Sequence, residues 1–141
     1  MAPPVNLLLV EDDEVDVQGL KRAFAKSRIG NPIVVARDGI EALEHLRGEN
    51  GRAKLPKPHL IMLDLNMPRM NGIEFLEAIR ADDDLKCSVV FMITTSKAEE
   101  DKARAYGHNV AGYIVKQDPA NTFLEAVNLL EHYWKIVEFP G

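Results

Sequence analysis

Five short apolar runs, spaced at regular intervals along 141 residues, constrain the fold of this chain more than any other feature. The stretches between them carry apolar residues at helical spacing, as Val17, Leu20 and Phe24 do in the first stretch. Strict alternation of strands and helices predicts an α/β domain in three layers, with a parallel sheet between helices on both faces. The runs expected to form strands are Asn6–Val10, Pro32–Ala36, His59–Leu63, Val89–Ile93 and Gly112–Val115.

Composition excludes several classes of partner. The chain is 46% hydrophobic and 28% charged, with a formal net charge of -5, so we expect neither nucleic acid nor membrane as a partner. No apolar run is long enough to span a bilayer, and the first residues lack the pattern of a secretory signal. Cys87 is the single cysteine, which fits a reducing cytoplasm, and we expect it to be a buried thiol on a strand.

Acidic residues directly follow two of the apolar runs. Glu11, Asp12 and Asp13 follow the first run, and Asp64 follows the third. Sites in open parallel sheets form outside the carboxyl ends of strands, so we expect these carboxylates to share one crevice. Each pair at about 4 Å costs roughly 4 kcal/mol at an effective dielectric near 20. The cluster therefore predicts a bound cation, and oxygen ligands on loops suit Mg²⁺.

Two further runs end in polar residues. Thr94 and Ser96 follow the fourth run, and Lys116 follows the fifth. Any one such residue is more often a turn or cap residue, but four strand ends supplying acid, acid, hydroxyl and ammonium favour one site. The four histidines show no metal-ligand spacing, and no Gly-rich phosphate loop suggests a nucleotide enzyme.

The sequences LLLVEDD, LIMLDLNMPRMNG, FMITTS and GYIVK, in this order and spacing, resemble the receiver domain of two-component response regulators. The resemblance spans the chain and implies a flavodoxin-like fold with strand order 2-1-3-4-5. It also implies a single receiver domain over residues 1–141, with a core of about 5–135 and a C-terminal tail of 136–141. The loop Gly48–Pro58 and the tail motif around Tyr133 and Trp134 are similar to the subgroup that pairs with bacterial phytochrome kinases.

The resemblance assigns a role to each residue of the strand ends. It makes Asp64 the phosphoacceptor, which would become a 4-aspartylphosphate. Asp12 would bind Mg²⁺ directly and Glu11 through water, with the main-chain carbonyl of Asn66 as a further ligand. Asp13, one place beyond the acidic pair, is expected to cap the following helix.

The remaining roles concern the bound phosphoryl group. Thr94 and Lys116 would donate to its oxygens, and Tyr113 would turn inward as the switch residue. Asn66 and Ser96 would flank the attacking water and tune the loss of phosphate. Gln117 stands where many receivers carry proline, so we expect a trans Lys116–Gln117 bond.

The resemblance implies a stand-alone response regulator that takes a phosphoryl group from a sensor histidine kinase, of phytochrome type in this subgroup. Such a protein catalyses only its own phosphorylation and dephosphorylation. A shuttle or sink that exchanges phosphate with a histidine phosphotransfer protein is an alternative, as is a phosphorylation-independent dimeric adaptor. A hydrolase of small phosphoesters is more remote. Asn66 stands where haloacid-dehalogenase phosphatases carry a second aspartate.

Two segments predict mobility and association. The inward residues of the stretch 98–106 are mostly alanine, so we expect its helix to be the least firmly packed. The last helix, from about Asn121 to Lys135, carries two apolar stripes, although one suffices to cover a sheet. We expect a homodimer through the last strand, the last helix and the tail; the alternative is a tail folded back on its own subunit.

Overall fold

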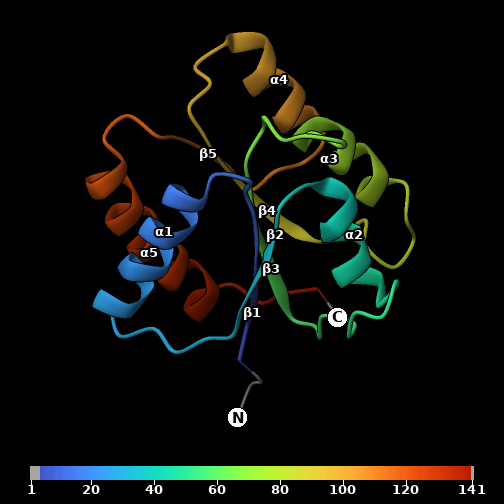
Figure 1. The fold of residues 1–141 in the computed structure, drawn as a ribbon, viewed down its shortest axis with the longest axis horizontal. Coiled ribbons are helices and arrows are strands. Elements are labelled where there is room, and N and C mark those ends of the chain that lie inside the picture. Colours follow the sequence, from blue (N-terminus) through green and yellow to red (C-terminus); the bar gives the residue numbers. More distant parts are fainter. Residues whose placement is uncertain (1–3, 141) are drawn as a thin grey trace.

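The computed structural model describes residues 4–140 (for 119 and 120, the backbone alone) and contains a parallel sheet with helices on both faces (Figure 1). The strands are β1 (Asn6–Val10), β2 (Ile33–Ala36), β3 (His59–Leu63), β4 (Val89–Thr94) and β5 (Gly112–Val115). The helices are α1 (Glu14–Lys26), α2 (Gly39–Arg47), α3 (Gly72–Arg80), α4 (Glu99–Gly107) and α5 (Pro119–Ile136). The strand order β2-β1-β3-β4-β5 confirms the predicted fold class and topology.

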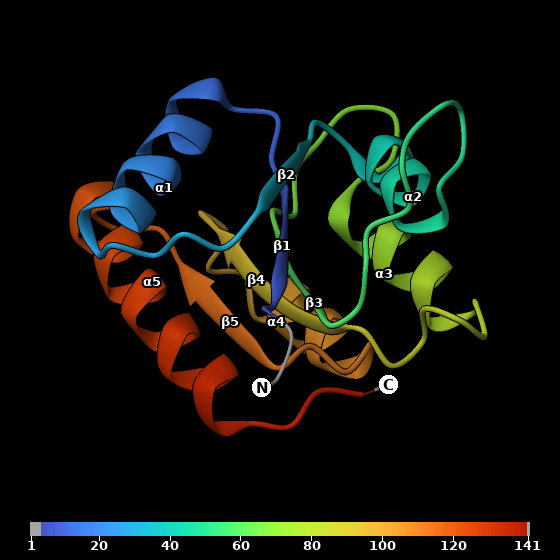
Figure 2. The ribbon, with the colours of Figure 1, turned by 90° about the horizontal axis from the view of Figure 1, so that it is seen from below.

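Apolar side chains fill both faces of the sheet and form one cluster on each. Successive strand residues point to opposite faces. Leu8 and Val10 of β1 therefore join the cluster beneath α2 and α3, whereas Leu7 and Leu9 join the cluster beneath α1 and α5. Figure 2 shows these two helix pairs on opposite sides of the sheet. Burial on both faces explains why the strands are apolar throughout rather than alternating.

Side-chain caps fix where the helices beside the acidic strand ends begin. Asp13 accepts hydrogen bonds from the first turn of α1, which confirms the predicted cap. Asp38 caps α2 in the same way. Asn71 and Glu74 form a reciprocal capping box at the start of α3. These contacts satisfy backbone N–H groups that the first helical turn leaves without partners.

Helix α4 is held less firmly than its neighbours. Ala105 is the one buried residue of this helix, and its N-cap residue Ala98 makes no side-chain cap bond. The expectation for the stretch 98–106 is therefore confirmed. Burial of a single small side chain contributes little apolar area, so displacing this helix costs little hydrophobic free energy.

Three details differ from the sequence predictions. Strand β2 begins after Pro32, and β4 extends through Thr94. The expectation of a buried Cys87 on a strand is wrong, because this residue is exposed in the turn between α3 and β4. Leu85 fills the core beneath that turn instead, and the strand begins at Val89.

The C-terminal tail folds back on its own subunit. The ring of Phe139 packs edge-on against Tyr133 of α5, with centroids 5.9 Å apart, and Tyr133 in turn contacts Phe91 of β4 at 5.0 Å. One of the two apolar stripes of α5 is only partly covered, because two of its residues, Leu129 and Ile136, are exposed. Within residues 4–140, no helix combines the length and apolarity needed to cross a membrane.

Candidate functional site

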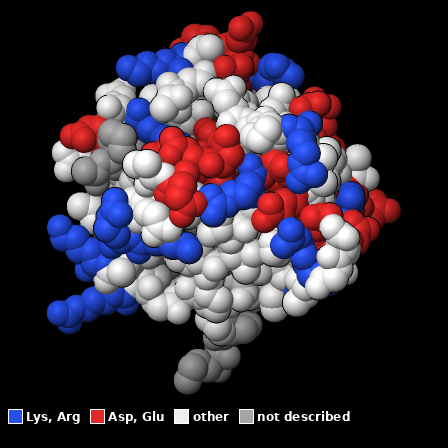
Figure 3. Space-filling model, in the orientation of Figure 1, with Lys and Arg blue, Asp and Glu red and all other residues white. Residues whose placement is uncertain are grey.

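The carboxyl ends of β1 and β3 bring the predicted acidic residues together. These strands are neighbours, and Val10 pairs with Leu63, so the residues that follow each strand emerge side by side. Glu11, Asp12 and Asp64 each offer a carboxylate oxygen, and the three oxygens lie within 4.8 Å of one another. Figure 3 shows acidic side chains gathered near the middle of the face seen in Figure 1. Such a concentration of negative charge, with oxygen donors alone, fits a hard divalent cation.

Lys116 enters this cluster from the end of β5. Its side chain is 3% exposed, and its Nζ donates to Glu11 Oε1 at 2.6 Å and to Asp16 Oδ2 at 2.8 Å. Nζ also lies 4.0 Å from Asp64 Oδ1. The peptide bond to Gln117 is trans, as predicted, and Lys116 nevertheless reaches the acidic cluster.

Asp16 is a member of the site that the sequence prediction missed. It lies in the first turn of α1, beyond the acidic motif, and its side chain is 17% exposed. One signal was available: at helical spacing, Asp16 falls four residues before Leu20, a residue expected to face the core. A carboxylate on the inward edge of a helix requires a partner, which here is Lys116.

The environment of the cluster changes the pKa values of Glu11 and Lys116. Burial raises the pKa of Glu11 from 4.5 to about 7, while the hydrogen bond from Lys116 opposes the rise and the charge of Asp64 adds to it. Burial acts to lower the pKa of Lys116, but its hydrogen bonds to Asp16 and Glu11, together with the negative charges of Asp64 and Glu11, outweigh this effect and raise it. The charged form of Lys116 is therefore favoured, whereas burial disfavours the charged form of Glu11. A cation in the cluster would favour the ionised carboxylate.

The predicted residues of β4 and β5 form a second group beside the cluster. Thr94 is fully buried, and its Oγ1 accepts from the Ser96 backbone N–H at 3.4 Å. Tyr113 donates its hydroxyl to the Ser96 carbonyl at 3.0 Å. Ser96 Oγ donates to Asp101, in the first turn of α4, at 2.6 Å. Thr94, Ser96 and Tyr113 thus form one network that reaches α4.

The loop after Asp64 folds back so that the start of α3 packs against the backbone of Asp64 and Leu65. The Leu65 N–H donates to Asp64 Oδ1 at 2.9 Å, and the Gly72 N–H donates to the Leu65 carbonyl at 2.8 Å. A Cβ on Gly72 would lie 2.5 Å from the Asp64 carbonyl oxygen, so only glycine fits here. Asn66 lies in this loop with an exposed side chain, which is compatible with a role for its main chain.

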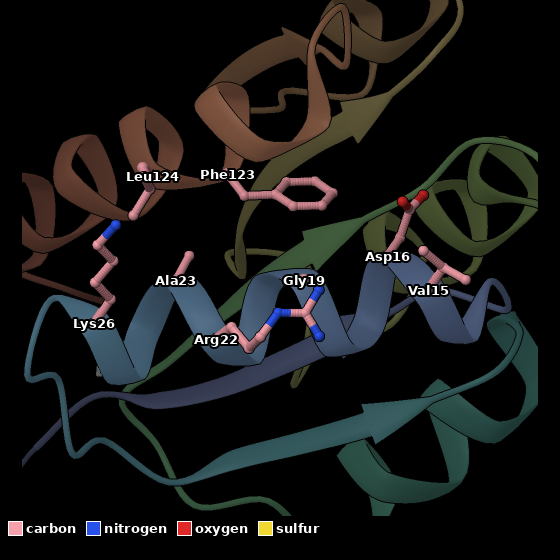
Figure 4. A pocket seen from close by; sticks show the side chains of 8 residues that line it. All are labelled: Val15, Asp16, Gly19, Arg22, Ala23, Lys26, Phe123 and Leu124. Atoms are coloured by element: carbon pink, nitrogen blue, oxygen red, sulfur yellow. The ribbon is translucent and has the colours of Figure 1, made fainter.

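A shallow apolar groove of about 410 Å³ opens between α1 and α5, next to the site (Figure 4). Gly19 of α1 lines the groove on one side, and the Phe123 ring and Leu124 line it on the α5 side. Val15 and Asp16 lie at one end, so the groove adjoins the residue that binds Lys116. The sequence prediction did not include this groove.

Comparison with known proteins identifies the class. The family model of the response regulator receiver domain matches residues 7–128, and the chain belongs to this family of signalling proteins. The chain is 33% identical over 132 residues to the response regulator Rcp1 of Synechocystis sp., an alignment that covers 94% of this chain and 90% of that protein.

Solved structures of phytochrome-associated response regulators are similar to this chain. The phosphorylated cyanobacterial phytochrome response regulator RcpA superposes with a TM-score of 0.88 at 34% identity, covering 99% of this chain and 100% of that chain. The Mn²⁺-bound form of Rcp1 superposes with a TM-score of 0.86 at 32% identity, covering 98% and 100%. The resemblance to receivers, and among them to the phytochrome-associated regulators, is confirmed.

Proposed function

We propose that this protein is a stand-alone response regulator that accepts a phosphoryl group from a histidine kinase onto Asp64. The observation that carries the proposal is the meeting of residues from the ends of β1, β3 and β5 around the Asp64 carboxylate. Acidic oxygens from β1 lie within 4.8 Å of Asp64, and the ammonium of Lys116 lies 4.0 Å away. The family match and the phosphorylated state of the related RcpA support the same reading.

The proposed reaction is an in-line displacement at phosphorus. A carboxylate oxygen of Asp64 attacks the phosphoryl group of a kinase phosphohistidine, forming a P–O bond as the P–N bond breaks. The bonding pair leaves with the imidazole nitrogen. Lys116 and the Thr94 hydroxyl would donate to the phosphoryl oxygens, whose negative charge otherwise repels the carboxylate nucleophile.

The acidic cluster would hold Mg²⁺ during this reaction. Asp12 and Asp64 would provide carboxylate oxygens, Glu11 would act through water, and Asn66 would provide its main-chain carbonyl. When bound, the ion supplies positive charge that offsets the repulsion between carboxylate and phosphoryl group. The Mn²⁺-bound form of the related Rcp1 supports a divalent ion in this role.

Phosphorylation would be read out through the network around Ser96. The new group adds roughly -1.5 to -2 charges and strong acceptors. Thr94 would turn to meet them, and Tyr113 would exchange its bond to the Ser96 carbonyl for a more inward position. Because α4 buries a single residue, it would move with this change and alter a protein-binding face. Ser96 and Asn66 would tune hydrolysis, so the protein would catalyse only its own phosphorylation and dephosphorylation.

We further infer a cytoplasmic protein whose residues 1–141 form one receiver domain, with a core of about 5–135. Its upstream partner would be a sensor histidine kinase of phytochrome type. The exposed Leu129 and Ile136 support homodimerisation through β5 and α5, with Phe139 of the tail retained on its own subunit.

The decisive experiment compares the wild type with Asp64→Asn in Mg²⁺ and acetyl phosphate, followed by intact-mass and peptide analysis. The wild type should gain one phosphoryl group on Asp64, and Asp64→Asn should gain none. Asp83→Asn is the matched control, because Asp83 is fully exposed in the turn after α3. Phosphorylation of Asp64→Asn at another residue would contradict the proposal.

A further inference from the structure

We propose that Asp16 is a positioning residue that holds the Lys116 ammonium beside Asp64 while Glu11 is engaged with the divalent ion. This inference rests on the proposed phosphoacceptor function. It concerns a residue outside the strand-end motif. Asp16 Oδ2 accepts from Lys116 Nζ at 2.8 Å, which is shorter than the 4.0 Å between Nζ and Asp64 Oδ1.

The argument begins with the donors of Lys116. An ammonium has three N–H bonds and no acceptor. Two of them are directed to Glu11 and Asp16, at 2.6 and 2.8 Å. The remaining N–H is free to serve the Asp64 side of the cluster. With its side chain 3% exposed, Lys116 has little water to orient it, so its carboxylate partners determine where the ammonium lies.

The two partners of Lys116 are not equivalent. Glu11 belongs to the group of three carboxylates whose oxygens lie within 4.8 Å of one another, and a cation there would compete with Lys116 for its oxygens. Asp16 makes the same kind of contact with Lys116 but is not a member of that group in the described part of the chain. It can therefore keep its bond to Lys116 when the cluster binds metal.

The position of Asp16 suits this role. It is anchored in the first turn of α1, behind the Asp13 cap, and Figure 4 shows its carboxylate pointing away from the helix on the side of Phe123. Lys116 is anchored at the end of β5, where its backbone N–H donates to the Thr94 carbonyl at 2.8 Å. The Asp16–Lys116 pair thus links α1 to the strand end that carries the phosphoryl-binding ammonium.

The test separates binding of the metal from binding of a phosphoryl mimic. Wild type, Asp16→Ala, Asp16→Asn and a matched control are titrated with Mn²⁺, and then with beryllofluoride at saturating Mg²⁺. Glu14→Gln is the control, because it removes an equal charge from the same helical turn, while Glu14 is exposed and paired with Arg37 and Gln18. Thermal unfolding verifies that each variant is folded.

Asp16→Ala should weaken beryllofluoride binding by about tenfold, the loss expected when a charge-assisted hydrogen bond no longer orients its donor. Asp16→Asn, which keeps an acceptor oxygen, should lose less. Mn²⁺ affinity in both should stay within about twofold of Glu14→Gln. Equal beryllofluoride affinity in Asp16→Ala and Glu14→Gln would overturn the inference, and so would a loss of Mn²⁺ affinity as large as the loss of beryllofluoride. Failure of the phosphoacceptor function itself would instead appear as absent labelling of the wild type.

Discussion

Arg69 Nε donates to Asp38 Oδ2 across 2.7 Å and thereby joins the loop after β3 to the N-cap residue of α2. Burial acts to raise the pKa of Asp38, but the hydrogen bonds from Arg69 and the Glu41 N–H, together with the positive charge of Arg69, outweigh this effect and lower it. A second contact reinforces the join: the Gly39 N–H donates to the Met70 carbonyl at 3.0 Å. Both contacts hold the second half of the loop that contains Asn66 against the start of α2.

We expect Arg69→Gln to weaken divalent-metal binding severalfold and to lower stability. Arg69 is more than half exposed, but its partner Asp38 is buried, so the variant leaves a buried carboxylate with one hydrogen-bond donor fewer, at a cost of roughly 1–3 kcal/mol. The loss of metal affinity should come from the altered geometry of the loop that carries Asn66. Metal titration and urea unfolding of the same samples measure the two effects. Arg47→Gln, which removes an exposed ion pair with Asp82, is the matched control. Unchanged metal affinity in Arg69→Gln would contradict the prediction.

Gly72→Ala should destabilise the protein by roughly 1–3 kcal/mol, because the new Cβ would lie 2.5 Å from a backbone oxygen that has little freedom to move. Chemical denaturation measures the loss, and phosphorylation of Asp64 should slow with it. Gly107→Ala, at the end of α4, has no atom within 4 Å of its Cβ and should be neutral or slightly stabilising. Equal stabilities of the two variants would refute the steric argument.

Tyr113→Ala should uncouple α4 from the phosphoryl site. The hydroxyl of Tyr113 contacts the Ser96 carbonyl, and Ser96 Oγ contacts Asp101 of α4, so the tyrosine belongs to the path between site and helix. Hydrogen exchange of α4 should change on addition of beryllofluoride in the wild type but not in Tyr113→Ala. Tyr106→Ala, which removes an exposed aromatic side chain, should respond as the wild type does. A full response in Tyr113→Ala would exclude the switch role.

His59 should make the protein less stable in mild acid. Burial lowers the pKa of His59 from 6.5 to about 4, and the charge of Lys57 adds to the decrease. Between about pH 6.5 and 4, His59 is therefore protonated in the unfolded chain but neutral in the folded chain. The free energy of unfolding falls as the pH decreases through this range. A shift of this size corresponds to roughly 2–4 kcal/mol.

Urea unfolding of the wild type and of His59→Gln at several pH values checks this prediction. The difference in unfolding free energy between them should shrink below pH 6.5, because the variant lacks the titrating group. His132→Gln, in which an exposed histidine is replaced, is the matched control and should follow the wild type. A constant difference between wild type and His59→Gln over the whole range would contradict the assignment.

Features that depend on the local sequence pattern could be predicted. Contacts that depend on the placement of helices against the sheet could not. The strand ends that carry Asp12, Asp64 and Lys116 follow from apolar runs and their polar terminations, since parallel strands must share an edge. The Asp16–Lys116 and Asp38–Arg69 pairs do not follow, because they depend on helix placement and on the rotamers of long side chains. The prediction of a buried Cys87 is wrong for a related reason. The identity of a small apolar residue just before a strand does not indicate whether it lies in the strand or in the exposed turn that precedes the strand.

The contact between Phe139 and Tyr133 sets the direction in which the end of the chain leaves the molecule. Phe139 and Pro140 lie beside His59 and Ser88, at the amino ends of β3 and β4. The acidic strand ends lie at the other edge of the sheet. A fluorescent protein or affinity tag fused after residue 140 would therefore emerge on the far side, and such a fusion should leave Asp64 open to a kinase.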